Sequence, residues 1–171
     1  IPKPVNVDDT IIVSTNFGQM EFKFYYDKSP LNSLNFKKLS NSHFYDNTLF
    51  HDIIPGFILQ GGDILSRNDN PDDDGHGSPG WTVDAEYNNL KHDRGTLSMV
   101  RTKNDSNSAG SQFFISLKEN NTTLDNEYTI FAYLVNGDHI LTRISKNPSE
   151  YYQAKLLCKV NIPLDENNED W

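Results

Sequence analysis

The alternation of apolar and polar residues near the N-terminus predicts a pair of β-strands. Met20, Phe22 and Phe24 are separated by charged residues, which is the period of a strand with one buried face. A β-branched run over residues 11–14 precedes them, and the gap over residues 15–18 contains asparagine and glycine. A tight turn is therefore expected to join the two runs into a hairpin.

A helix is predicted to begin at Pro30. Serine precedes this proline, and proline suits the first helical position because an N–H there would have no helical partner. Residues at helical spacing form its expected buried face, and they are Leu31, Leu34, Asn35 and Leu39, with Phe36 alongside. Lys37 and Lys38 are expected to point away from that face.

Short strand-like runs continue along the rest of the chain. They cover residues 49–54, 57–60, 81–83, 96–100, 113–117, 129–135 and 156–162, while 63–79 is a polar loop and 140–144 a second short helix. Many short strands, two helices and no strand–helix–strand alternation favour a closed β-barrel over a parallel sheet. With no repeat or linker, one domain is expected over residues 1–171, with its core at about 10–162 and polar ends.

Composition narrows the classes of function. The 171 residues carry a formal net charge of −9, which argues against nucleic acid because phosphate binding needs clustered Lys and Arg. No apolar run reaches the roughly 18 residues of a membrane span. Cys158 is the single cysteine, so no internal disulfide is possible, and cytoplasmic and exported locations both stay open. The first residue is Ile1 rather than Met, which predicts removal of a signal peptide or another upstream segment.

The acidic run over residues 70–75 resembles the start of a calcium-binding loop. Trp81 occupies the position where such a loop needs a bidentate glutamate, so an EF-hand is not predicted. A looser surface cation site is the remaining alternative, with Asp69, Asp72 and Asp74 as its ligands.

Several blocks of residues resemble the cyclophilins, a family of peptidyl-prolyl cis-trans isomerases, and they occur in that family's order. They are Asn35-Phe36, Phe44-Tyr45, Phe50-His51, Ile54-Pro55-Gly56-Phe57, Gln60-Gly61-Gly62-Asp63, Arg94-Gly95-Thr96-Leu97-Ser98-Met99, Asn107-Ser108-Ala109-Gly110-Ser111-Gln112-Phe113-Phe114-Ile115, Leu124-Asp125 and Tyr128-Thr129-Ile130-Phe131. The phrase Gly77-Ser78-Pro79-Gly80-Trp81 looks most like bacterial members. The resemblance implies an eight-stranded antiparallel barrel capped by two helices, with the substrate groove on its outer face.

The resemblance also implies a set of site residues. Those expected to hold the proline ring are Phe57, Ile58, Phe114 and Leu124. Gln60 would orient the substrate, Gln112 would form a polar wall, Val100 and Arg101 would pair with the substrate backbone, and His51 would lie beside the groove. Tyr128 stands where better-known members carry His. Thr123 stands where they often carry Trp, which implies weak cyclosporin binding at most.

Asp52 departs from the family pattern, because it stands where cyclophilins place their catalytic arginine. Rotation about an X-Pro bond is helped by a donor aimed at the proline nitrogen of the twisted amide, and an ionised aspartate only accepts hydrogen bonds. Arg101 could act as a substitute donor, or it could pair with Asp52 and close part of the groove.

Two functions are therefore expected to compete. The first is a prolyl isomerase that assists the folding of client proteins, with weak or absent activity. The second is a module or chaperone that binds proline peptides without turning them over. Partners would be proline-containing peptides or unfolded clients, the chain would be a monomer, and no cofactor or metal is implied because bond rotation transfers neither electrons nor groups.

Overall fold

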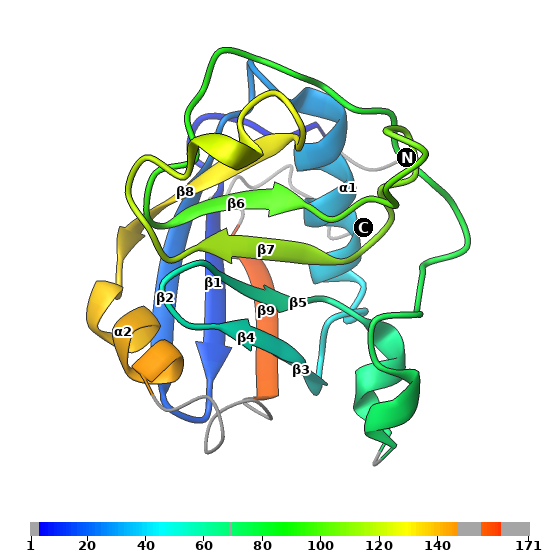
Figure 1. The fold of residues 1–171 in the computed structure, drawn as a ribbon, viewed down its shortest axis with the longest axis vertical. Coiled ribbons are helices and arrows are strands. Elements are labelled where there is room, and N and C mark those ends of the chain that lie inside the picture. Colours follow the sequence, from blue (N-terminus) through cyan, green and yellow to red (C-terminus); the bar gives the residue numbers. More distant parts are fainter. Residues whose placement is uncertain (1–3, 69, 147–154, 162–171) are drawn as a thin grey trace, which may run out of the picture.

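The fold is an antiparallel β-sheet with two α-helices packed against it (Figure 1). The computed structural model describes residues 4–68, 70–146 and 155–161, the last of these for the backbone only. The strands are β1 (Thr10–Thr15), β2 (Gly18–Phe24), β3 (Thr48–Leu49), β4 (Asp52–Ile54), β5 (Ile58–Gly61), β6 (Thr96–Met99), β7 (Phe113–Ser116), β8 (Ile130–Asn136) and β9 (Lys155–Asn161). They form one curled sheet in the order β3-β9-β1-β2-β8-β6-β7-β5-β4.

Most of the predicted strands are confirmed, including the N-terminal hairpin, in which Thr15 pairs with Gly18. The strand predicted over residues 81–83 is wrong. Within the described part of the chain, only an isolated bridge from Val83 to Ala109 occurs there, and Trp81 is 41% exposed. The C-terminal end beyond Ile162, predicted to be polar, lies outside the described residues.

The predicted closed eight-stranded barrel is not confirmed. The sheet has nine strands, and no ladder joins its end strands β3 and β4 in the regions that the structure describes. What is confirmed is a mainly β fold with two α-helices.

The helix α1 (Pro30–Asn41) begins at the predicted proline, and α2 (Asp138–Lys146) is the predicted second helix. Phe36 of α1 lies at the centre of an aromatic core, with ring centroids 5.1–6.3 Å from those of Phe24, Tyr45, Phe113 and Phe131. Such a cluster buries large apolar areas and fixes the helix against the sheet.

The expected faces of α1 are partly wrong. Leu31 is 55% exposed, whereas Lys37 is only 1% exposed and its ammonium lies 2.6 Å from the Asp9 carboxylate. A buried charge needs a partner, and Asp9 supplies one from the segment just before β1.

Two loops beside the sheet are shaped by short 3-10 helices. The first loop contains η1 (Ile64–Arg67) and η2 (Pro71–Asp73), and buried Asp63 holds it by accepting hydrogen bonds from the backbone N–H groups of Leu65 and Gly75. The second loop contains η3 (Thr122–Leu124).

Among the described helices, none is long and apolar enough to cross a membrane.

Candidate functional site

The candidate site lies on the face of β4, β5, β7 and β6 that points away from the core. Leu59, Ile115 and Leu97 are paired across three of these strands and are fully buried on the inner face. Successive side chains alternate between the faces of a strand. The neighbouring row, Asp52, Gln60, Phe114 and Ser98, therefore belongs to the opposite face, and each member is the direct cross-strand partner of the next.

Phe114 is the anchor of this row. Its side chain is 3% exposed, because the ring of His92 stacks on it with centroids 5.9 Å apart and the Tyr128 ring meets it edge-on at 5.2 Å. His92 is itself held at both ring nitrogens, by Asp125 at 2.9 Å and by the Ser98 hydroxyl at 2.9 Å. The predicted pocket residues Phe114 and Tyr128 are thus in contact.

The other predicted apolar residues lie around the same strands. Ile58 shares the face of Gln60, since the two are separated by one residue on β5. Phe57 is half-buried, and Leu124 is 8% exposed. Both are tied to Asn121, whose side-chain amide donates to the Phe57 carbonyl at 3.4 Å and whose own carbonyl accepts from the Leu124 N–H at 3.1 Å.

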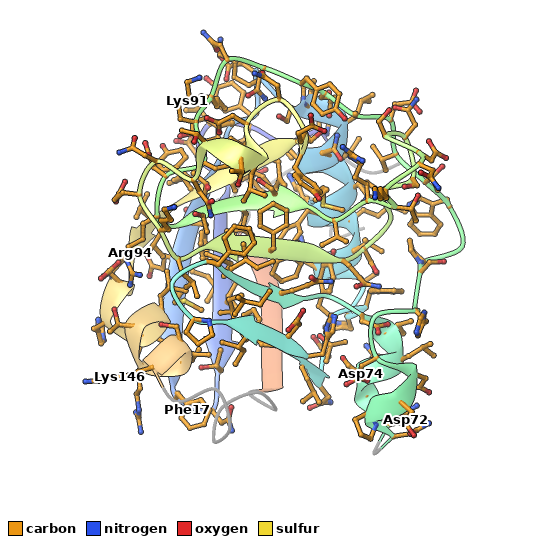
Figure 2. The ribbon with its side chains drawn as sticks, in the orientation of Figure 1. Phe17, Asp72, Asp74, Lys91, Arg94 and Lys146 are labelled. Atoms are coloured by element: carbon orange, nitrogen blue, oxygen red, sulfur yellow. The ribbon has the colours of Figure 1, made fainter. Side chains whose placement is uncertain are left out.

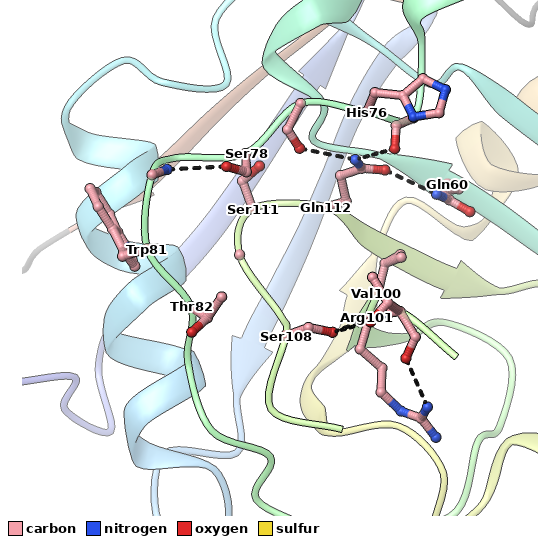
Figure 3. A pocket seen from close by; sticks show the side chains of 15 residues that line it. Gln60, His76, Ser78, Trp81, Thr82, Val100, Arg101, Ser108, Ser111 and Gln112 are labelled. Carbon is pink, nitrogen blue, oxygen red and sulfur yellow. Dashed lines mark hydrogen bonds between the residues drawn. The ribbon is translucent and has the colours of Figure 1, made fainter. Parts of the chain in front are cut away.

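Two glutamines link this row to a neighbouring cavity. The Gln60 amide donates to the Gln112 side-chain oxygen at 3.1 Å, and the Gln112 amide donates to the carbonyls of Gly75 at 2.9 Å and Gly77 at 3.1 Å (Figure 3). The cavity has a volume of about 600 Å³. The predicted site residues that line it are Gln60, Val100, Arg101 and Gln112.

Several lining residues were not predicted from the sequence. They include Ser78, Trp81, Thr82, Thr102 and Ser108. The Trp81 indole N–H donates to the Asn35 side chain at 2.8 Å, and the Asn35 amide donates to the Gly110 carbonyl at 2.7 Å. Helix α1 thereby holds both walls of the cavity. A tryptophan within a polar, glycine-rich loop was the signal that could have marked this wall.

Asp52 and His51 lie next to each other at the edge of the groove. Asp52 is exposed, and no hydrogen bond or ion pair reaches its carboxylate from any residue that the structure describes. Both ring nitrogens of His51 are buried without a hydrogen-bond partner among those same residues. Burial lowers the pKa of His51, although the nearby carboxylates of Asp63, Asp74 and Asp52 act in the opposite direction.

Arg101 is held away from Asp52. Its guanidinium donates to the Glu127 carboxylate at 2.9 Å and the Glu127 carbonyl at 2.8 Å, and it lies 5.0 Å from the centre of the Tyr128 ring. It also donates to the backbone carbonyls of Thr102 and Lys103. The expectation that Arg101 pairs with Asp52 is therefore wrong.

The fold is shared with solved structures of cyclophilins. A cyclophilin-type peptidyl-prolyl cis-trans isomerase of Cryptosporidium parvum, crystallised in the presence of the dipeptide Ala-Pro, superposes with a TM-score of 0.77 at 32% identity and covers 91% of this chain and 99% of its own.

Sequence comparisons agree with the structural one. The family profile described as cyclophilin type peptidyl-prolyl cis-trans isomerase/CLD matches residues 10–163. The peptidyl-prolyl cis-trans isomerase of Acinetobacter baylyi is 33% identical over 144 residues, or 82% of this chain and 73% of that protein. Peptidyl-prolyl cis-trans isomerase B of Bacillus subtilis is 38% identical over 122 residues, or 70% and 78%. The chain belongs to the cyclophilin-type peptidyl-prolyl cis-trans isomerase family and is an isomerase by family.

Proposed function

We propose that the groove binds proline-containing segments and turns over their X-Pro bonds only slowly. The proline ring would lie against Phe57, Ile58, Phe114 and Leu124. The observation that carries the proposal is the position of Asp52, which lies directly across from Gln60 on the groove face where the cyclophilin pattern places a catalytic arginine.

The chemistry of that position explains the slow rate. The barrier to X-Pro rotation is about 18–20 kcal/mol, because the amide bond has partial double-bond character. Twisting the bond makes the nitrogen pyramidal, so a donor aimed at it stabilises the transition state more than the ground state. Arginine offers five donors and a permanent positive charge, whereas ionised aspartate offers only acceptors. Loss of such a donor costs about 2.7–4 kcal/mol, or a factor on the order of 100–1000 in rate.

The arrangement of Arg101 supports the same conclusion. Its guanidinium is engaged by Glu127 and by backbone carbonyls, so a substitute donor would have to leave those partners first. Because Glu127 is 62% exposed, this ion pair contributes only about 0.2–1 kcal/mol, so the cost of release comes from losing it together with the hydrogen bonds to the backbone carbonyls.

The experiment compares the natural chain with Asp52→Arg and Asp52→Asn. Two-dimensional exchange spectroscopy on a short Ala-Pro peptide gives the cis-trans exchange rate, and amide shifts during titration give the affinity. We expect Asp52→Arg to raise the exchange rate on the order of 100-fold or more. Asp52→Asn removes the negative charge without supplying the arginine fork, so its gain should be much smaller. A natural chain as fast as the arginine variant would show that Asp52 does not limit the reaction.

A second candidate function is a binding module that holds proline segments without isomerising them. The ion pair between Arg101 and Glu127 favours this alternative, because it holds that guanidinium on Glu127 rather than on a bound substrate. Peptide binding with no enhancement of cis-trans exchange would select the module, whereas the absence of peptide binding would reject both functions.

A further inference from the structure

Asp52 lies on the same face of the sheet as the proposed proline site, two strands away from Phe114. Its carboxylate is exposed and has no hydrogen-bond or ion-pair partner among the described residues. Its cross-strand partner Gln60 lines the cavity, and Gln60 in turn is the cross-strand partner of Phe114. Asp52 is thus one strand away from the cavity wall and two strands away from the aromatic anchor.

Among the residues whose side chains the structure describes, none forms an ion pair with the carboxylate of Asp52. Arg101, the cationic residue that lines the cavity, is already paired with Glu127. Burial lowers the pKa of His51 and so disfavours its charged form, although the carboxylates of Asp63, Asp74 and Asp52 act in the opposite direction. A further carboxylate belongs to Asp74, which lies on the loop that carries η2 (Figure 2). It interacts electrostatically with the His51 ring. A substrate bound here would meet an uncompensated negative charge.

We propose that Asp52 selects proline segments with a lysine or arginine within two residues of the proline. The inference rests on the proposed function, since it assumes that the proline lies against Phe114. Neighbouring strands are about 4.8 Å apart, which puts Asp52 about 10 Å from the strand of Phe114. One residue step of about 3.8 Å and the long stem of a basic side chain cover that distance.

The exposure of the Asp52 carboxylate limits how strongly it can favour a basic peptide. Ion pairs at exposed positions contribute about 0.2–1 kcal/mol, which corresponds to a difference of up to about fivefold in affinity. The preference should weaken strongly near 1 M salt, because the Debye length there is about 3 Å.

The test measures the affinity of the protein for one neutral Ala-Pro peptide and for a set of peptide variants. Each variant carries a single Lys or Glu at one of the two positions before the proline or one of the two positions after it. The protein variants are Asp52→Asn, Asp52→Lys and the control Asp8→Asn, which removes the same charge from an exposed residue that precedes β1. We expect the natural chain and the Asp8 variant to bind the best lysine peptide about two- to fivefold more tightly than the matching glutamate peptide. Asp52→Asn should lose this difference and Asp52→Lys should reverse it, while the control Asp8→Asn binds the neutral peptide as the natural chain does.

Three other outcomes of the binding test would overturn the preference, its assignment to Asp52, or the proposed function. Equal binding of the lysine and glutamate peptides by the natural chain overturns the preference but leaves the proposed function standing. A preference that persists in Asp52→Asn overturns its assignment to Asp52. Failure of the neutral peptide to bind the natural chain rejects the proposed function and the inference together.

Discussion

The ring of His92 stacks on Phe114, the residue proposed to hold the proline, so the removal of this ring should lower both the stability of the protein and its affinity for peptides. The ring is fully buried, stacks on Phe114, and bridges Asp125 to the Ser98 hydroxyl. Neutral histidine can satisfy both partners only as a donor to the carboxylate and an acceptor from the hydroxyl. Burial lowers the pKa of His92 despite the hydrogen bond to Asp125, which favours this neutral form.

The cost of His92→Ala follows from those contacts. The hydrogen bond to a carboxylate is worth about 1.5–3 kcal/mol, and an unpaired buried hydroxyl costs about 1–3 kcal/mol. The ring pair with Phe114 adds about 0.5–1.5 kcal/mol. Because contacts in one network are not additive, we expect a total loss of about 3–5 kcal/mol in the free energy of unfolding.

Urea unfolding with linear extrapolation measures this loss. His139→Ala is the matched control, because His139 is exposed on α2 and its removal should change stability by less than about 0.5 kcal/mol. Ser98→Ala breaks only one link and should cost about 1–2 kcal/mol. Peptide titration of the folded fraction should show weaker binding for His92→Ala. A loss below about 1 kcal/mol with unchanged peptide affinity would refute this account of the groove floor.

Two further predictions concern buried charge. Asp9→Ala should lower the free energy of unfolding by about 3–5 kcal/mol, because it leaves the buried Lys37 ammonium without its carboxylate partner. The double variant with Leu at position 9 and Met at position 37 should recover most of that loss, because it buries no charge. A double variant as unstable as Asp9→Ala would contradict this explanation. Burial lowers the pKa values of His51 and His92, so below about pH 6.5 the unfolded chain binds protons that the folded chain does not. The free energy of unfolding should therefore fall as the pH drops below about 6.5 and level off at higher pH. Urea unfolding measured across this pH range would show no such slope if the two rings were not desolvated.

The local pattern of the sequence was sufficient for most elements. The alternation at Met20, Phe22 and Phe24 marks a strand because the backbone period of two acts on neighbouring residues alone. Pro30 marks the start of α1 for a similar local reason. The order of the family motifs likewise identified the cyclophilin family.

Contacts between segments that are far apart in the chain could not be predicted from the local sequence pattern. Lys37 was expected to face solvent, but its burial depends on Asp9, which only folding brings beside α1. The role of Trp81 as a cavity wall depends on Asn35, 46 residues earlier in the chain. Glu127 holds Arg101 across 26 residues, and this pairing removes the expected partner of Asp52.

The sequence by itself determined most of the segments that form strands and helices, the family to which the chain belongs, and the presence of an aspartate at position 52. Only the tertiary structure decided that this aspartate is unpaired among the described residues and that Arg101 is engaged elsewhere. The physical reason is that secondary structure follows from periodicities of neighbouring residues, whereas charge pairing and burial depend on side chains that meet across the folded chain.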